Sequence, residues 1–179
     1  APVEKEIKNR FKDAVYTTEE QVSLEMAVAD LLKQNHLTMC TAESCTGGMI
    51  AARMVNVPGV SGVFMEGMVT YSNEAKMRLL GGREDTLKAY GAVSEETARE
   101  MAEGGVNTSG TDLCVATTGI AGPDGGTDEK PVGLVYMACC LRGKTCVRRY
   151  QFKGNREKVR EQAMMKALDL ARLCILANK

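Results

Sequence analysis

Residues 41–48 read TAESCTGG and place three hydroxyl groups, a thiol, a carboxylate and two glycines between an apolar stretch and the segment MIAARMV. Such a segment is typical of the turn between a strand and a helix. A serine there can present its hydroxyl as a nucleophile, while the next backbone N–H groups face a developing oxyanion. Glu43, Ser44 and Thr46 are equally ordinary helix-capping residues. The spacing alone leaves both interpretations open, and a nearby base would favour the first.

Lys76 is the candidate for that base. The single histidine, His36, precedes the first expected strand and so lies towards the opposite end of the sheet. Lys76 ends the segment YSNEAK, one turn into a helix that follows a neighbouring strand. It can accept a proton only if burial and nearby positive potential lower its pKa from about 10.4 towards 7 or 8. Tyr71, in the same segment, is a candidate for proton relay or substrate binding. A solvated lysine and a packed tyrosine are the alternative interpretation.

A glycine-rich segment follows the third expected strand and reads TTGIAGPDGGTDEKPVG (residues 117–133). Its glycines, its threonines, Asp124 and Lys130 form a donor-rich rim that suits a phosphate or a ribose. The segment is neither a Walker loop nor a dinucleotide fingerprint, because no GK[ST] follows and no helix begins directly after the glycines. A long turn that binds nothing is the alternative interpretation.

Composition narrows the function classes. A chain of 179 residues with 44% hydrophobic content is long enough for one core, and 23 basic and 23 acidic residues leave no net field for nucleic acid or an anionic membrane. No apolar run reaches the roughly 18 residues of a membrane span, so we expect a cytoplasmic protein. The seven cysteines mostly have apolar neighbours, which favours reduced core thiols. One histidine excludes most zinc and Ser-His-Asp schemes.

The elements that must position these residues follow from periodicity, caps and turn residues. Helices are expected over residues 18–34, 49–55, 73–80, 84–89 and 93–105 and from residue 155 onwards, and strands over 37–42, 63–72, 112–119, 132–142 and 144–152. The last two strands join through Arg142–Lys144 as an antiparallel hairpin. This order predicts an α/β fold, a three-layer α/β/α sandwich around a mixed, mostly parallel sheet of about five strands. Ligands collect at the carboxyl ends of such strands, where all three segments lie.

Four segments, TAESCTGG, VTYSNEAK, GAVSEETAREMA and GIAGPDGGTDEKPVG, resemble in order and spacing the signature segments of the CinA C-terminal domain family. The resemblance runs from residue 18 to residue 179. Residues 1–17, which are polar and lack clear periodicity, look like the linker that joins this domain to the N-terminal portion of two-domain CinA proteins.

The resemblance implies a nicotinamide-nucleotide amidase, which hydrolyses nicotinamide mononucleotide to nicotinate mononucleotide and ammonia in pyridine-nucleotide salvage without a metal or cofactor. Its Ser/Lys mechanism implies Ser44 as nucleophile and Lys76 as base, with Tyr71 as an auxiliary. Cys45 is a rival nucleophile, ranked second because no imidazole is placed to lower its pKa. The implied substrate-binding residues are Cys45, Thr46, Gly47, Gly48, Thr118, Gly119, Gly122, Gly125, Gly126 and Lys130, with N–H groups of residues 45–47 facing the oxyanion.

The expected partners are the small nucleotide substrate, further copies of the chain in a homo-oligomer and an N-terminal CinA domain in the full-length protein. No nucleic acid or membrane partner is expected. The alternative is a non-catalytic C-terminal module that binds a nucleotide or a partner, or that assists oligomerisation, in a competence- or damage-inducible CinA protein.

Overall fold

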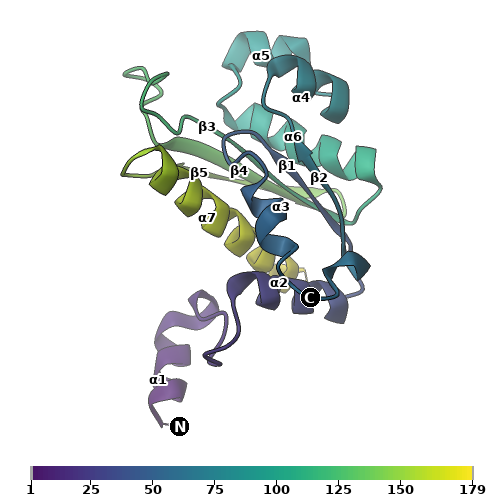
Figure 1. The fold of residues 1–179 in the computed structure, drawn as a ribbon, viewed down its shortest axis with the longest axis vertical. Helices are drawn as coiled ribbons and strands as arrows, with labels where there is room; N and C mark the ends of the chain where they lie inside the picture. Colours follow the sequence, from purple (N-terminus) through teal and green to yellow (C-terminus); the bar gives the residue numbers. More distant parts are fainter. Residues whose placement is uncertain (1, 179) are drawn as a thin grey trace.

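A five-stranded sheet lies between two layers of helices in the computed structural model, which describes residues 2–178 (Figure 1). The strands are β1 (Met39–Glu43), β2 (Phe64–Val69), β3 (Leu113–Gly119), β4 (Leu134–Leu141) and β5 (Lys144–Gln151), in the order β2-β1-β3-β4-β5. β1 is parallel to β2 and β3, whereas β4 is antiparallel to β3 and β5. Only β4 among these strands therefore runs in the reverse direction. The predicted mixed, mostly parallel sheet is confirmed.

Helices cover both faces of the sheet, as the buried residues of β1 and β3 require. One face packs against α2 (Leu24–Gln34), α3 (Met49–Met54) and α7 (Arg156–Ala177). The other face packs against α6 (Glu95–Ser109), which also contacts α4 (Asn73–Leu80) and α5 (Glu84–Tyr90). Short 3-10 turns occupy Lys12–Ala14 and Val60–Gly62. No helix between residues 2 and 178 combines the length and apolar character needed to cross a bilayer.

Two adjacent glycines set how closely α6 approaches its neighbours. A Cβ at Gly104 would collide with the Leu80 carbonyl of α4, and a Cβ at Gly105 would collide with the Cys114 sulfur of β3. Glycine is needed at both positions because the Leu80 backbone and the buried Cys114 side chain lie too close for any side chain there. The pair thereby fixes α4 against the sheet, and α4 carries Lys76.

The first part of the chain differs from the prediction. The helix expected from residue 18 begins at Leu24, where the Ser23 hydroxyl accepts a hydrogen bond from the Met26 N–H at 3.4 Å. The predicted start was wrong because Thr17 instead accepts from the Glu19 N–H at 3.0 Å and forms a turn.

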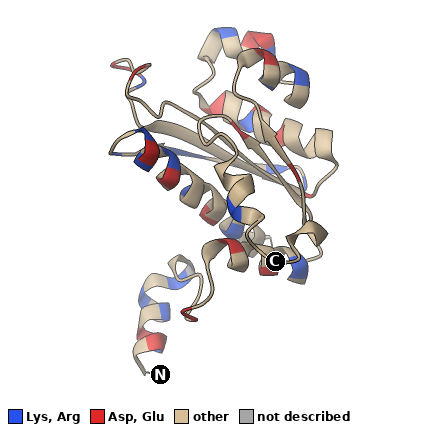
Figure 2. Ribbon diagram, viewed as in Figure 1, with Lys and Arg blue, Asp and Glu red and all other residues tan. Residues whose placement is uncertain are grey.

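The expected linker contains a helix, α1 (Pro2–Phe11), which has no buried residue and stands apart from the sheet (Figure 1). Its support comes from ion pairs one turn apart, Lys8 with Glu4 at 2.8 Å and Arg10 with Glu6 at 2.7 Å. Figure 2 shows both charge signs side by side on α1. An apolar stripe was the signal sought, and this helix is stabilised by charge pairs instead.

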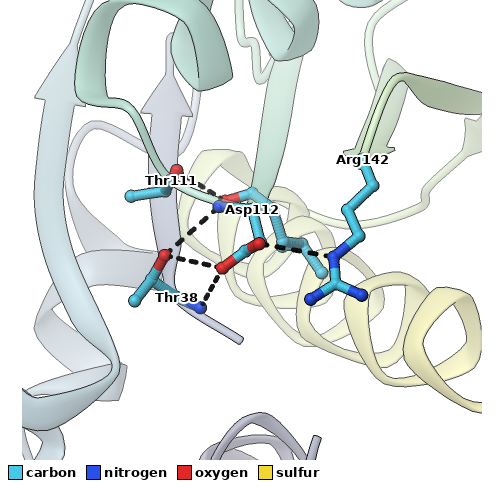
Figure 3. Close-up of polar contacts among 5 residues, drawn as sticks. Thr38, Thr111, Asp112 and Arg142 are labelled. Carbon is cyan, nitrogen blue, oxygen red and sulfur yellow. Dashed lines mark hydrogen bonds and ion pairs between the residues drawn. The ribbon is translucent and has the colours of Figure 1, made fainter. Parts of the chain in front are cut away.

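Asp112 ties together three chain segments at the amino end of β1 and β3 (Figure 3). Its carboxylate accepts hydrogen bonds from the backbone N–H and hydroxyl of Thr38, at 2.9 and 3.0 Å, and from Arg142 Nε at 3.3 Å. Burial alone would raise the pKa of Asp112, but these donors outweigh it and hold the pKa below the ordinary 3.8. The carboxylate therefore stabilises the β1–β3 register and the β4–β5 turn.

We expect Asp112→Asn to lower the free energy of unfolding by about 1 to 2 kcal/mol near pH 7. Because the folded pKa lies below the unfolded one, the contribution is complete above pH 3.8 and is lost as the pH falls below it. Urea unfolding at pH 7 and pH 3 measures the difference, with Asp128→Asn in an exposed loop as the control. A deficit that stays the same at both pH values would contradict the assignment.

Candidate active site

Ser44 directly follows β1, and its backbone continues the hydrogen bonding of the sheet. Its backbone N–H donates to the Thr117 carbonyl of β3 at 3.0 Å, which extends the β1–β3 ladder by one residue. The side chain is 9% exposed. Its Oγ lies 3.2 Å from the Nζ of Lys76, a residue 32 positions away in the sequence. The fold therefore brings together the two side chains that the sequence singled out.

Lys76 reaches Ser44 from the first half of α4, whose amino end is capped by the Ser72 hydroxyl. Besides Ser44, its Nζ contacts the carbonyl oxygens of Thr70 at 2.9 Å and Tyr71 at 3.3 Å, and both must accept. A neutral amine has two N–H donors and one lone pair. If the carbonyls take both donors, the lone pair points at the Ser44 hydroxyl, which is the arrangement a general base needs.

The surroundings of Lys76 favour that neutral form. The side chain is only 1% exposed, and no ion pair found within residues 2–178 includes it. Burial lowers the pKa of Lys76 below its ordinary 10.5, against smaller opposing effects of Cys45 and Glu74. The cost of burying an unpaired ammonium is the physical cause.

Glu43 takes the capping role that spacing had allowed for Ser44. Its carboxylate is 1% exposed and accepts from the N–H groups of Gly48, Ile50 and Ala51 at 3.0, 3.1 and 2.9 Å. It also accepts from the Thr46 hydroxyl at 2.7 Å. Because Glu43 satisfies the amino end of α3, the Ser44 hydroxyl is left to interact with Lys76.

A cavity of about 200 Å³ opens beside Ser44 and Lys76. Of the residues predicted for the site, six line it: Ser44, Cys45, Tyr71, Lys76, Thr118 and Gly119. The sequence did not single out four further lining residues: Ala92, Val93, Ala121 and Arg156. Ala92 and Val93 are held there by the buried Thr118 hydroxyl, which donates to the Ala92 carbonyl at 2.6 Å.

Arg156 is the charged residue among those four, and it lies at the start of α7. Its guanidinium donates to the Gly122 carbonyl at 2.8 Å and to the Tyr71 phenol oxygen at 3.1 Å. The Tyr71 side chain is 62% exposed, and the contacts found within residues 2–178 do not join its phenol to Ser44 or Lys76. Tyr71 therefore contacts Lys76 through its carbonyl and extends its ring towards the cavity mouth.

The remaining predicted residues of the serine turn build its shape. The Thr46 hydroxyl is buried between Glu43 and the Thr117 hydroxyl. The Gly47 N–H donates to the Ser44 carbonyl at 3.1 Å, and the Gly48 N–H donates to Glu43. Both glycines have positive φ angles of 59° and 92°, which disfavour any side chain. Among the three N–H groups expected at the oxyanion, Gly47 is thus already bonded to a carbonyl, whereas those of Cys45 and Thr46 face the Cys45 thiol, a weak acceptor.

Most of the glycine-rich segment lies outside the cavity lining. Gly122 contributes its carbonyl to Arg156, and Gly126 lies against Val132, where a Cβ would be 2.8 Å from the Val132 nitrogen. Gly125 is exposed. Lys130 Nζ donates to the Tyr90 carbonyl at 2.5 Å. The structure therefore places Gly122, Gly125, Gly126 and Lys130 around the site rather than in its wall.

The rival nucleophile Cys45 also lines the cavity. Burial raises the pKa of its thiol to about 11, despite nearby backbone donors. All seven cysteines are free thiols. No group of three or more His, Cys, Asp or Glu side chains within the described residues is arranged to hold a metal.

The family model of the CinA C-terminal domain matches residues 21–175. A putative competence-damage inducible protein of Clostridium perfringens (strain 13 / Type A) is 56% identical over 172 residues, which cover 96% of this chain and 42% of the relative. A CinA-like protein of Kosmotoga olearia is 53% identical over 176 residues, covering 98% of this chain and 42% of the relative. The chain thus spans less than half the length of these relatives.

Solved structures show the same fold. A competence-damaged protein (CinA) superfamily protein from Klebsiella pneumoniae has a TM-score of 0.83 and 36% identity, covering 86% of this chain and 96% of that one. The competence/damage inducible protein CihA from Agrobacterium tumefaciens has a TM-score of 0.82 and 39% identity, covering 85% and 93%. With a family model that matches most of its length and relatives of this similarity, the chain belongs to the CinA C-terminal domain family.

Proposed function

We propose that this chain is an amidohydrolase that converts nicotinamide mononucleotide to nicotinate mononucleotide and ammonia, in pyridine-nucleotide salvage in the cytoplasm. The observation that carries the proposal is the buried contact of 3.2 Å between Lys76 Nζ and Ser44 Oγ, with the other donors of Nζ directed at two carbonyls. A nucleophile and a base within hydrogen-bond reach are the signature of covalent catalysis.

In this mechanism neutral Lys76 accepts the Ser44 proton as Oγ attacks the carboxamide carbon. The N–H groups of Cys45 and Thr46 stabilise the oxyanion, each contributing about 3 to 4 kcal/mol if they act as donors do in comparable sites. Protonated Lys76 then delivers its proton to the departing ammonia. A water molecule, activated by the same lysine, hydrolyses the resulting ester and frees Ser44.

The size and polarity of the cavity support a substrate with a small reactive end and an anionic tail. Its volume of about 200 Å³ lies below the roughly 300–1,000 Å³ typical for sites that enclose a drug-sized ligand. The carboxamide and its ring would therefore enter the cavity, while the ribose and phosphate remain at the mouth. Arg156 lies at that mouth and offers a planar, bidentate partner for phosphate.

Ammonia release tests the proposal directly. We expect steady turnover of nicotinamide mononucleotide and at least tenfold lower kcat/KM for nicotinamide riboside and nicotinamide, which lack the phosphate. Folded protein that releases no ammonia from the mononucleotide would overturn it.

We expect Arg156→Met to raise KM for nicotinamide mononucleotide by about tenfold or more, with a smaller change in kcat, because a charged pairing worth roughly 1.5 to 3 kcal/mol is lost. Lys158→Met, an exposed cation on the same turn of α7 outside the cavity lining, is the matched control. KM values for nicotinamide riboside should not respond to Arg156→Met. Equal increases in KM from Arg156→Met and Lys158→Met would mean that any positive charge near the cavity has the same effect, and that Arg156 does not bind the phosphate specifically.

A second candidate function is a nucleotide-binding module that acts within a longer protein. It is favoured by the relatives, of which this chain covers 42%, and by α1, which has no buried residue. Calorimetric binding of nicotinamide mononucleotide without turnover would support this function over the amidase.

A further inference from the structure

Arg160 lies one turn after Arg156 on α7, and its guanidinium contacts the serine turn, residues 44–48. Its Nε donates to the Cys45 carbonyl at 3.0 Å and its Nη2 donates to the Thr46 carbonyl at 2.9 Å. The side chain is half-buried, and it appears in no ion pair between residues 2 and 178. A guanidinium that gives two donors to two consecutive carbonyls fixes the peptide units to which they belong.

Because the peptide bond is planar, a carbonyl held by Arg160 also sets the direction of the N–H group of the next residue. In a trans peptide the C=O and the N–H of the next residue point in opposite directions within one plane. The Cys45 carbonyl points at Arg160, so the Thr46 N–H points away from Arg160. In the same way, the hydrogen bond from Gly47 N–H to the Ser44 carbonyl fixes the direction of the Cys45 N–H. Within residues 2–178, these two N–H groups face the Cys45 thiol, a weak acceptor that a substrate oxygen can replace.

Glu43 and Arg160 hold the serine turn through complementary groups, one as hydrogen-bond acceptor and the other as donor. The carboxylate takes N–H donors at the start of α3, and the guanidinium takes the carbonyls that precede them. Removing Glu43 would expose buried donors and damage α3 itself. Removing Arg160 leaves only the Cys45 carbonyl without its partner, because the Thr46 carbonyl also accepts from the Met49 N–H at 3.3 Å, and water can enter the space that the half-buried arginine side chain leaves. Arg160 can therefore be tested without loss of the fold.

We infer that Arg160 is a positioning residue for the reaction: by holding the Cys45 carbonyl, it aims the Thr46 N–H at the substrate oxygen. Without it, the Cys45–Thr46 peptide can rotate, which removes a donor from the oxyanion and brings a carbonyl dipole towards it. Arg160 acts through the backbone and does not touch the substrate. This inference rests on the proposed function of Ser44 and Lys76.

Steady-state kinetics of Arg160→Ala, Arg160→Lys and Lys158→Ala separate positioning from a structural role. We expect Arg160→Ala to lower kcat by about 10²-fold while KM for nicotinamide mononucleotide changes less than about threefold, as for the loss of one oxyanion donor. Arg160→Lys should recover only part of kcat, because one ammonium cannot reproduce the planar fork. Added guanidinium at millimolar concentration should raise kcat of the alanine variant, and Lys158→Ala should behave as wild type.

Two results would overturn the inference: unchanged kcat in Arg160→Ala, or a loss that guanidinium does not restore and that matches the unfolded fraction in urea titrations. A substrate-independent readout separates this failure from failure of the proposed function. A phosphonofluoridate phosphonylates an activated serine with release of fluoride and places a P–O oxygen at the oxyanion position. If wild type is labelled at Ser44 but releases no ammonia, the proposed substrate is wrong. A labelling rate unchanged by Arg160→Ala would overturn the positioning role alone.

Discussion

Replacement of Ser44 by alanine is expected to lower kcat for ammonia release by about 10⁴-fold or more, because it removes the atom that forms the covalent intermediate. The fold should survive. Lys76 keeps its contacts with the carbonyls of Thr70 and Tyr71, so the variant leaves no buried donor without a partner. We therefore expect an unfolding free energy within about 1 kcal/mol of wild type and an unchanged affinity for the mononucleotide.

Cys45→Ala is the matched control for Ser44→Ala, since the two residues are adjacent and both line the cavity. With a thiol pKa of about 11, roughly one Cys45 in 10⁴ is a thiolate at pH 7. We expect Cys45→Ala to keep kcat within about threefold of wild type and iodoacetamide to alkylate Cys45 slowly. An inactive alanine variant at position 45, with an active one at position 44, would reverse the assignment of the nucleophile.

Replacement of Lys76 by methionine is expected to lower kcat/KM by about 10³-fold, the typical contribution of a positioned general base. Wild-type kcat/KM should rise with pH as Lys76 loses its proton, with a midpoint below 10.5, because burial lowers the pKa of this lysine. The remaining activity of Lys76→Met should not follow that curve. Lys76→Arg keeps donors but cannot become neutral, so it should be as inactive as the methionine variant.

The same lowered pKa predicts a stability effect that requires no activity. Between the folded pKa of Lys76 and its unfolded value near 10.4, the unfolded chain binds the additional proton, so the unfolding free energy of wild type rises with pH across that window. Lys76→Met should lack this rise in parallel urea titrations. A wild-type curve that coincides with the methionine curve would mean that Lys76 is protonated in the folded protein.

The proximity of Ser44 and Lys76 could be predicted from the sequence, because each residue lies close to the end of its own strand. Ser44 follows a strand by one residue and Lys76 lies one turn inside a helix that follows the neighbouring strand, and the carboxyl ends of parallel strands meet. The positions of Arg156 beside the cavity and of Arg160 beside the serine turn could not be predicted in this way. They reach the site from α7, more than 80 residues after Tyr71 and more than 110 after Cys45, and nothing in a helical pattern of mixed charge marks two arginines out.

Which of the three candidates, Glu43, Ser44 or Thr46, caps α3 could not be decided from the sequence for a related reason. Serine and threonine near a helix start are the usual caps, whereas Glu43 belongs to β1 and reaches the helix only because the turn folds back over its carboxylate. Such a cap depends on tertiary structure. The start of α2 was predicted at Thr18, whereas the Ser23 hydroxyl caps the helix at Leu24 and the preceding residues form a local turn at Thr17.

The central claim is that Ser44 becomes acylated during turnover, and acid-quenched mass spectrometry of the protein mixed with nicotinamide mononucleotide tests it most directly. Quenching within the first turnover at enzyme concentrations near that of the substrate captures the ester before water removes it. We predict a nicotinate-mononucleotide adduct on the peptide that contains Ser44, in wild type and Cys45→Ala, with none in Ser44→Ala and far slower formation in Lys76→Met. An adduct on Cys45, or ammonia release through the first turnover with no adduct on the protein, would contradict it.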